Sequence, residues 1–252
     1  MTPSRRPGEN AQMPVVEGFV IAEQDVAGTR APGDTAEVRT TIDASRGCER
    51  LEQRVIRFDP GRSQDRREAD RQEVLFVVSG TGTLHLDGGE HVLEPGTAAF
   101  VAPGETYAVE ADGELMAVSV TAPTSERGVG GNRKVTVRYE DQEVLPASPD
   151  REFRYLVNQD AGCLDITQFV GVIPPGRAPE HSHSYDEVVY ILDGTGVYHI
   201  AGEDFPLSPG TCLHLPPYVR HCIENTGGGQ LRVLGVFHPS GDPASRAYVE
   251  NK

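Results

Sequence analysis

Three histidines and one glutamate in the second half of the chain have the residue types and spacing of a metal site. His181 and His183 are separated by one residue, Glu187 follows after a break of three residues, and His221 comes later. Side chains at positions i and i+2 of a strand leave the same face, so we expect His181 and His183 to point the same way. Three imidazoles and one carboxylate suit a divalent transition metal and leave coordination positions open.

These ligands belong to a wider pattern of two motifs: Gly176, His181, His183, Glu187 and Gly194, then Gly210, Pro216, Tyr218, His221 and Asn225. The pattern closely resembles the two motifs of the cupin superfamily. The resemblance implies that His181, His183, Glu187 and His221 bind one metal at the centre of a small β-barrel. Two positions depart from the family pattern, since Gly176 is one residue nearer to His181 than usual and Tyr218 stands where a turn glycine is usual.

The composition favours an all-β protein and excludes some partners. The 252 residues include 28 glycines, 19 prolines and no tryptophan, and the apolar runs are short. Regular short strands separated by turn residues indicate a jelly-roll or similar closed β architecture. The formal net charge of −15 argues against nucleic acid and anionic membrane surfaces as partners. It does not argue against an anionic substrate, because a metal ion can hold an anion inside an acidic protein.

The sequence also predicts where the protein works. No apolar run approaches the length of about 20 residues that a membrane-spanning helix needs. Residues 1–14 are polar and include Arg5 and Arg6, so we expect a flexible tail rather than a secretory signal. The cysteines lack the spacing of zinc fingers or CxxC motifs, which favours reduced, buried thiols and a cytoplasmic location; they are Cys48, Cys163, Cys212 and Cys222.

The chain repeats itself with an offset of 114 residues. Glu73 aligns with Glu187, Gly80-Thr81-Gly82 with Gly194-Thr195-Gly196, and Pro95-Gly96-Thr97 with Pro209-Gly210-Thr211. A period of this length indicates two copies of a whole domain. We therefore predict two tandem cupin-type jelly-roll barrels, at residues 15–125 and 126–252. Terminal strands are sometimes exchanged between the domains of such families, so the exact boundary stays open.

The repeat predicts that the first barrel has lost its metal site. Arg67 and Ala69 stand where the second half has His181 and His183, and Tyr107 takes the place of His221. Because arginine cannot ligate a cation, we expect one divalent metal per chain, with iron, manganese, nickel and zinc all possible. The first barrel is then a scaffold and a dimerisation surface, and we expect a homodimer.

Further residues of the second half are candidates for roles around the metal. His214, which aligns with Phe100, shares a strand face with Cys212. If that face is the barrel lumen, His214 is an acid or base near the metal and Cys212 lines the substrate site. If it is the outer face, His214 packs against the neighbouring sheet. The other candidates for substrate contact are Arg154, Gln168 and Tyr190.

Three functions use such a site. The resemblance favours an iron(II) dioxygenase that acts on a small, oxygen-rich chelating substrate. Alternatively, the metal acts as a Lewis acid in an isomerase, cyclase, decarboxylase or lyase. The third possibility is a non-catalytic module that binds a small molecule. No DNA-binding segment accompanies the barrels, which disfavours a transcription regulator.

Overall fold

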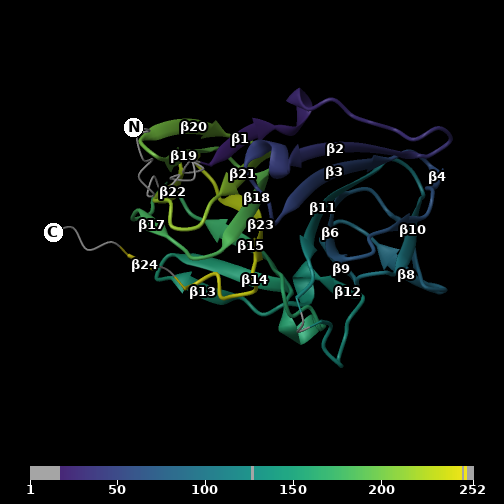
Figure 1. Cartoon of the computed structure of the whole chain (residues 1–252). Coiled ribbons are helices and arrows are strands. Elements are labelled where there is room, and N and C mark those ends of the chain that lie inside the picture. The colour runs from purple at the N-terminus through teal and green to yellow at the C-terminus, as the bar shows by residue number, and fades with distance from the viewer. Residues whose placement is uncertain (1–17, 126–127, 246, 249–252) are drawn as a thin grey trace, which may run out of the picture.

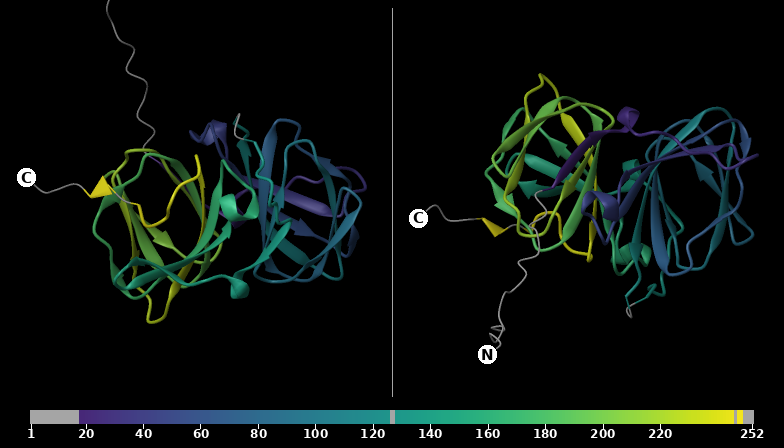
Figure 2. Two further views of the ribbon diagram at one scale, coloured as in Figure 1. Left: turned by 90° about the horizontal axis from the view of Figure 1, so that it is seen from below. Right: turned by 45° about the horizontal axis from the view of Figure 1, so that its top comes forward.

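Two β-barrels lie side by side in the computed structural model, which describes residues 18–125, 128–245 and 247–248 (Figures 1 and 2). The tail expected at residues 1–14 lies outside the described residues. Each barrel consists of one large and one small antiparallel sheet. The prediction of an all-β protein with jelly-roll barrels is confirmed.

The first barrel is built from a six-stranded and a five-stranded sheet. In pairing order, the large sheet contains β12 (Thr136–Arg138), β9 (Thr97–Val101), β6 (Arg71–Ser79), β11 (Leu115–Pro123), β3 (Glu52–Phe58) and β2 (Ala36–Ile42). The small sheet contains β4 (Gly61–Arg62), β10 (Thr106–Ala111), β7 (Gly82–Leu86) and β8 (Gly89–Leu93), with β5 (Arg66–Arg67) also paired to β10.

The second barrel repeats this plan with a seven-stranded and a six-stranded sheet. In pairing order, the large sheet contains β1 (Phe19–Ala22), β21 (Thr211–Leu215), β18 (Asp186–Asp193), β23 (Leu231–His238), β15 (Thr167–Ile173), β14 (Arg151–Val157) and β13 (Leu145–Ser148). The small sheet contains β20 (Glu203–Leu207), β19 (Gly196–Ile200), β22 (His221–Asn225), β17 (His181–Ser182) and β24 (Ala247–Tyr248), with β16 (Gly176–Arg177) also paired to β22.

Helices are nearly absent from the described residues, where four short 3-10 turns occur: η1 (Glu23–Asp25), η2 (Ala44–Arg46), η3 (Tyr139–Asp141) and η4 (Gln159–Ala161). No helix in this part of the chain has the length and apolar character needed to cross a membrane. The turns η2 and η4 end at Gly47 and Gly162, whose φ angles of 85° and 83° lie in the left-handed region that glycine adopts most readily. The same cap thus occurs at matching points of the two halves.

The outermost strand of each large sheet comes from the other half of the sequence. β1 precedes the first barrel, yet it pairs with β21, with Phe19 opposite His214. β12 follows the expected boundary at residue 125, yet it pairs with β9, with Thr136 opposite Ala99. The two exchanges are equivalent, because β9 and β21 hold matching places in the repeat.

Three large apolar clusters, and a small aromatic one described below, fill the described part of the molecule. One lies inside the first barrel and includes Phe58 and Leu84, and a second lies inside the second barrel and includes Tyr198 and Ile191. The third joins the two large sheets, since it contains residues of both barrels such as Val118 and Val188. The large sheet of the second barrel is therefore buried on both faces, one toward the lumen and one toward the first barrel.

Candidate metal centre

The four predicted ligands line one cavity of the second barrel. His181 lies on β17, His183 directly follows that strand, Glu187 is near the start of β18, and His221 begins β22. The cavity has a volume of about 90 Å³. Both sheets of the barrel thus contribute side chains to one enclosed point, although the ligands come from segments that lie apart in the sequence.

The ligand side chains are close to one another. His181 and His221 are cross-strand partners, with ring centroids 4.7 Å apart. The rings of His183 and His221 are separated by 4.8 Å. Nε2 of His183 lies 3.1 Å from Oε2 of Glu187, but the two atoms do not form a hydrogen bond, so this Nε2 has no hydrogen-bond partner among the described residues.

Backbone carbonyls orient all three imidazoles in the same way. Nδ1 of His183 lies 2.8 Å from the carbonyl oxygen of Tyr185, and Nδ1 of His221 lies 2.9 Å from that of Val219. Nδ1 of His181 lies 3.3 Å from the Pro179 carbonyl oxygen. A carbonyl accepts only from a protonated nitrogen, so each neutral ring carries its proton on Nδ1 and its lone pair on Nε2. This is the tautomer that a metal ligand requires.

A buried tyrosine adds a second polar group without a partner. The Tyr198 hydroxyl makes no hydrogen bond with any described residue, and its ring centroid is 6.1 Å from that of His221. Burial raises the pKa of Tyr198, and the Glu187 carboxylate raises it further. Because buried polar atoms seldom stay unpaired, Nε2 of His183 indicates that a bound group completes the site. Tyr198 is near His221 but does not itself line the cavity. The donor set of three imidazoles and one carboxylate fits a divalent transition metal.

The rest of the cavity is mainly apolar, with one cation and one anion, Arg151 and Glu152. An aromatic cluster of Phe153, Phe169 and Phe237 packs beside the ligands, and Phe169 lines the cavity. Arg151 also lines the cavity and donates a hydrogen bond of 3.3 Å to the Ile223 carbonyl oxygen. Sequence reasoning missed Arg151. Its place at the start of β14, beside the middle of β22, could not be inferred without the fold.

A glycine makes room for this arrangement. A Cβ atom at Gly235 would overlap the Phe169 ring and lie 3.0 Å from Oε1 of Glu187. The first barrel has Ser119 at the matching point, opposite Leu75 as Gly235 is opposite Val189. The residue without a side chain is therefore found in the second barrel, where Phe169 and Glu187 occupy the space that a Cβ atom would take.

The turn before His221 keeps the shape of a glycine turn although it contains Tyr218. Tyr218 has a φ of 64°, in the left-handed region that non-glycine residues rarely adopt. Its backbone N–H donates a hydrogen bond of 2.7 Å to the His183 carbonyl oxygen. The departure from the family pattern therefore leaves the turn in place, and that turn holds the two ligand segments together.

The first barrel has a different centre. Glu73, which matches Glu187, is buried and accepts a hydrogen bond of 3.0 Å from the Tyr107 hydroxyl, and it also accepts one from Ser119. Arg67 donates to the Gly104 carbonyl oxygen at 2.7 Å, and Ala69 is exposed. None of these contacts resembles the imidazole cluster of the second barrel.

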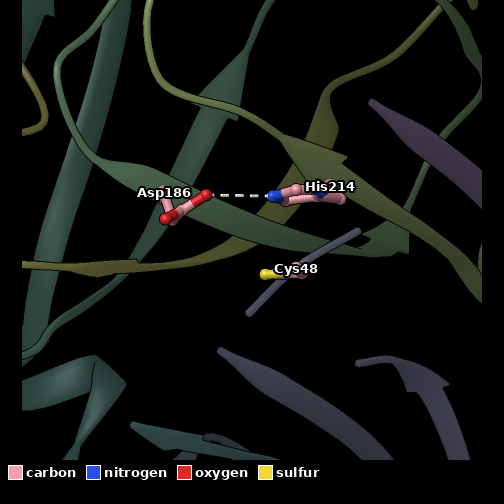
Figure 3. A group of neighbouring side chains, drawn as sticks. All are labelled: Cys48, Asp186 and His214. Atoms are coloured by element: carbon pink, nitrogen blue, oxygen red, sulfur yellow. Dashed lines mark hydrogen bonds and ion pairs between the residues drawn. The ribbon is translucent and has the colours of Figure 1, made fainter. Parts of the chain in front are cut away.

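The lumen interpretation of His214 is wrong. Leu213 and Leu215 of β21 belong to the cluster inside the barrel, whereas Cys212 and its face belong to the cluster between the barrels. His214 is fully buried on this second face, where Nε2 lies 3.1 Å from Oδ1 of Asp186, and Cys48 of the first half lies beside them (Figure 3). Neither His214 nor Cys212 lines the metal cavity.

The other predicted substrate contacts are also outside the cavity. Tyr190 packs in the cluster between the barrels. Gln168 is fully buried and pairs across the sheet with Val236 of that same cluster. Arg154 donates to the carbonyl oxygens of Tyr139 and Glu140, and its guanidinium group lies over the Tyr139 ring. The strand alternation that directs Glu187 inward directs these side chains away from the ligands.

Comparisons with solved structures agree with the fold. The structure of Ylba from Escherichia coli has a TM-score of 0.73 at 14% identity, covering 90% of this chain and 93% of that one. A Lactobacillus farciminis oxalate decarboxylase in complex with formate has a TM-score of 0.70 at 14% identity, covering 88% and 86% of the two chains. At this identity the likeness concerns the fold alone.

Sequence relatives match one barrel-sized segment each. An oxalate-binding protein of Thermotoga maritima is 39% identical over 67 residues, covering 26% of this chain and 55% of that protein. An uncharacterized protein of Methanocaldococcus jannaschii is 33% identical over 70 residues, covering 27% and 56%. The chain thus spans just over half the length of these relatives. A model of the cupin domain matches residues 54–121 and 169–237, which together exceed half of the chain. The protein therefore belongs to the cupin family, as a bicupin with two such domains in tandem.

Proposed function

We propose that the protein is a metal-dependent enzyme that acts on a small chelating carboxylate, and that His181, His183, Glu187 and His221 hold its one catalytic metal. The observation that carries this proposal is the common orientation of the three imidazoles, whose Nδ1 atoms all face backbone carbonyls. The metal would supply Lewis-acid polarisation of a bound carbonyl or carboxylate. The metal could be iron, manganese, nickel or zinc.

The charge of the site favours an anionic substrate. Three neutral imidazoles and one carboxylate would leave a divalent ion with net positive charge. Arg151 and Glu152 also line the cavity and offset each other, so the positive charge of the site would come from the ion. A guanidinium group pairs well with a carboxylate through two parallel hydrogen bonds. The chain's overall acidity does not oppose this, because the local charges act in an enclosed site of low dielectric.

The size of the site favours a small substrate. A cavity of about 90 Å³ accommodates a molecule of a few heavy atoms rather than a sugar or a nucleotide. A two- or three-carbon acid with two oxygens in chelating positions satisfies this limit. The match to a protein that binds oxalate supports the same class.

Lewis-acid chemistry fits such a substrate better than the dioxygenase reaction does. An ion that prefers six ligands keeps about two positions beyond the four protein ligands. A substrate that binds through two oxygens would use both, which favours Lewis-acid chemistry, whereas a substrate bound through one oxygen would leave a position for dioxygen. Isomerisation needs a base and an acid beside the polarised substrate, and hydrolysis needs a water molecule. Decarboxylation releases carbon dioxide and needs a proton donor for the carbanion that is left, so none of the three requires dioxygen as a reactant.

The side chains around the cavity have separable tasks. Arg151 would bind and orient the substrate carboxylate, and Phe153 and Phe169 exclude water from the reacting atoms. Tyr198 would hold a proton close to Glu187, since the Glu187 carboxylate already raises the pKa of its hydroxyl. The first barrel serves as a scaffold in this proposal, and a homodimer formed through it remains part of the proposal.

The experiment combines metal analysis with binding and turnover. The full chain, purified with and without added manganese or iron, is mixed with oxalate, malonate, glycolate or acetate as probes. Isothermal calorimetry measures binding, and nuclear magnetic resonance measures product formation under air and under nitrogen. We expect metal-dependent binding of the chelating acids in preference to acetate, and turnover without oxygen uptake.

Two variants separate the outcomes. His183→Ala should lose the barrel metal and all binding, whereas His199→Ala should keep both, because His199 contacts Asp204 and Glu224 outside the cavity. Oxygen uptake that depends on substrate would support the dioxygenase hypothesis instead. Tight binding without turnover would support the hypothesis of a non-catalytic binding module. If His183→Ala kept its full metal content, the assignment of His183 as a metal ligand would be wrong.

A further inference from the structure

Cys48, Asp186 and His214 meet where the two barrels pack together (Figure 3). One potential ligand atom from each residue lies within 4.8 Å of those of the other two. Cys48 and His214 are buried, and the Asp186 side chain is only 14% exposed. The cluster lies on the opposite face of the sheet from Glu187, so it is separate from the cavity of the catalytic metal.

This cluster contains a polar atom that nothing else in the described chain satisfies. Nε2 of His214 lies 3.1 Å from Oδ1 of Asp186, but Nδ1 is buried without a hydrogen-bond partner among the described residues. On the same face, Nδ1 of His238 also has no such partner, and His238 is the cross-strand neighbour of Asp186. Because Nε2 is the His214 nitrogen that faces Asp186, Nδ1 stays outside the cluster. The two unpaired nitrogens show that this buried interface is incompletely satisfied by the described residues, which is uncommon.

The internal repeat provides a built-in comparison. The matching point of the first barrel has Cys163 beside Gln72, with a hydrogen bond of 3.1 Å from Sγ to Oε1, and Phe100 matches His214. There, an amide and an apolar ring replace the carboxylate and the imidazole. A cysteine is therefore compatible with this interface without any ion, whereas the ligand-forming set occurs around Cys48 alone of the two.

The charges of the cluster suit one particular kind of ion. One thiolate and one carboxylate neutralise a divalent cation, so the occupied site would carry no net charge into the buried interface. Thiolate, imidazole and carboxylate together are typical zinc ligands, whereas magnesium, calcium and manganese prefer oxygen ligands. Zinc–ligand bonds of about 2.0–2.3 Å place neighbouring ligand atoms about 3.5 Å apart. The three atoms lie within 4.8 Å of one another, so they would have to move slightly closer together to bind one ion.

We propose that Cys48, Asp186 and His214 form a second metal site that binds zinc or a chemically similar ion between the two barrels. The ion would link a loop of the first half to β18 and β21 of the second, and so fix how the barrels pack. Three protein ligands leave one coordination position, and the partly exposed Asp186 marks the route by which the ion enters.

Cobalt(II) is the probe that distinguishes this site, because a thiolate ligand gives it a charge-transfer absorption in the near ultraviolet that imidazoles and carboxylates do not. The full chain is stripped with a chelator and titrated with cobalt. We expect two equivalents to bind, and the charge-transfer band to follow one of them. Cys48→Ser and His214→Phe should each bind one equivalent without the band, and Asp186→Asn should weaken the second equivalent about 10-fold or more.

Two controls address folding and the other metal site. Cys163→Ser, at the matching position, should keep both equivalents and the band. His181→Ala should lose the barrel equivalent but keep the band, so this site is tested whether or not the catalytic site is correct. A wild-type protein without the thiolate band, or a band that persists in Cys48→Ser, would overturn the proposal. His214→Phe introduces the side chain found in the first barrel, and circular dichroism checks that it folds.

Discussion

Tyr107 donates a hydrogen bond of 3.0 Å to Glu73 at the centre of the first barrel, in the places that His221 and Glu187 occupy in the second. One repeat thus satisfies its buried carboxyl with a hydroxyl, and the other surrounds it with imidazoles. The pKa of Glu73 is raised, because burial disfavours the charged form more than the hydrogen bonds from Ser119 and Tyr107 favour it. The equivalent glutamates therefore provide a matched pair of substitutions.

Glu73→Gln should stabilise the protein near neutral pH, whereas Glu187→Gln should cost metal. The raised pKa means that the folded state of Glu73 binds more protons than the unfolded state, so stability falls as pH rises through that pKa. An amide keeps an acceptor for Tyr107 without a buried charge. We expect a melting temperature about 2–4 °C higher at pH 8, as for a gain of about 1 kcal/mol.

In the same assay, Glu187→Gln should bind the barrel metal about 10-fold or more weakly. Thermal melts between pH 4.5 and 8, with elemental analysis of both variants, provide the measurement. A Glu73→Gln protein that melts below the wild type at pH 8 would contradict the burial argument.

Tyr198→Phe should have opposite effects on stability and activity. Without the metal, the substitution removes a buried hydroxyl that has no partner among the described residues, so the free energy of unfolding should rise by about 1 kcal/mol. With metal and substrate, the same hydroxyl is expected to hold a proton, so kcat should fall while metal content stays unchanged. Denaturant titration of the metal-free protein and steady-state kinetics of the loaded protein test the two signs, and an unchanged kcat would remove Tyr198 from the mechanism.

Arg151→Gln should weaken the binding of anionic substrates and leave the metal in place. Loss of one charge-assisted contact is expected to raise KM about 10-fold, which corresponds to about 1.4 kcal/mol. Arg154→Gln is the control, because Arg154 contacts Tyr139 and Glu140 rather than the cavity. Equal effects of the two variants would show that Arg151 has no special role at the cavity.

Asp165→Asn should lower the free energy of unfolding without changing the metal content. Burial alone would raise the pKa of Asp165, but hydrogen bonds from Ser125 and from Gln72 outweigh burial and lower it. A lowered pKa means that the stabilisation is present above the unfolded value of 3.8 and is lost as pH falls through the folded pKa.

We therefore expect Asp165→Asn to cost about 2 kcal/mol at pH 7, and progressively less as the pH falls below 3.8. Urea denaturation at several pH values provides the measurement, with metal content as the check on the sites. A loss that is independent of pH would mean that the charge of Asp165 is not what stabilises the contact with Gln72 and Ser125.

The sequence was sufficient for the architecture but not for how strands are shared. Short strands separated by turn residues predicted barrels, and the structure contains such strands, for example Gly196–Ile200 and Thr211–Leu215. The pairing of β1 with β21 could not be assigned, because a four-residue edge strand carries little information about its partner. Family resemblance suggested only that terminal strands are sometimes exchanged.

For the site, spacing identified side chains that converge, but it could not assign faces. His214 and Cys212 share a face, as expected, yet every residue of β21 is buried, so alternation between polar and apolar residues does not tell the lumen from the interface between barrels. Arg151 was missed for a related reason. It reaches the cavity only because β14 and β22 come together in space, and its neighbours in sequence give no signal of that contact.

Because β1 and β12 each complete the sheet of the other barrel, the folding of the two repeats is coupled. If the chain were cut near residue 125, each fragment would have an unpaired sheet edge. The first fragment would still carry β1, whose partner β21 is in the second, and the second would carry β12, whose partner β9 is in the first. Calorimetry should therefore record one heat-absorption peak for the intact chain rather than two. A barrel from a different protein could replace one repeat only if it also supplied the edge strand that this repeat contributes to the other barrel. Neither repeat can therefore be exchanged on its own.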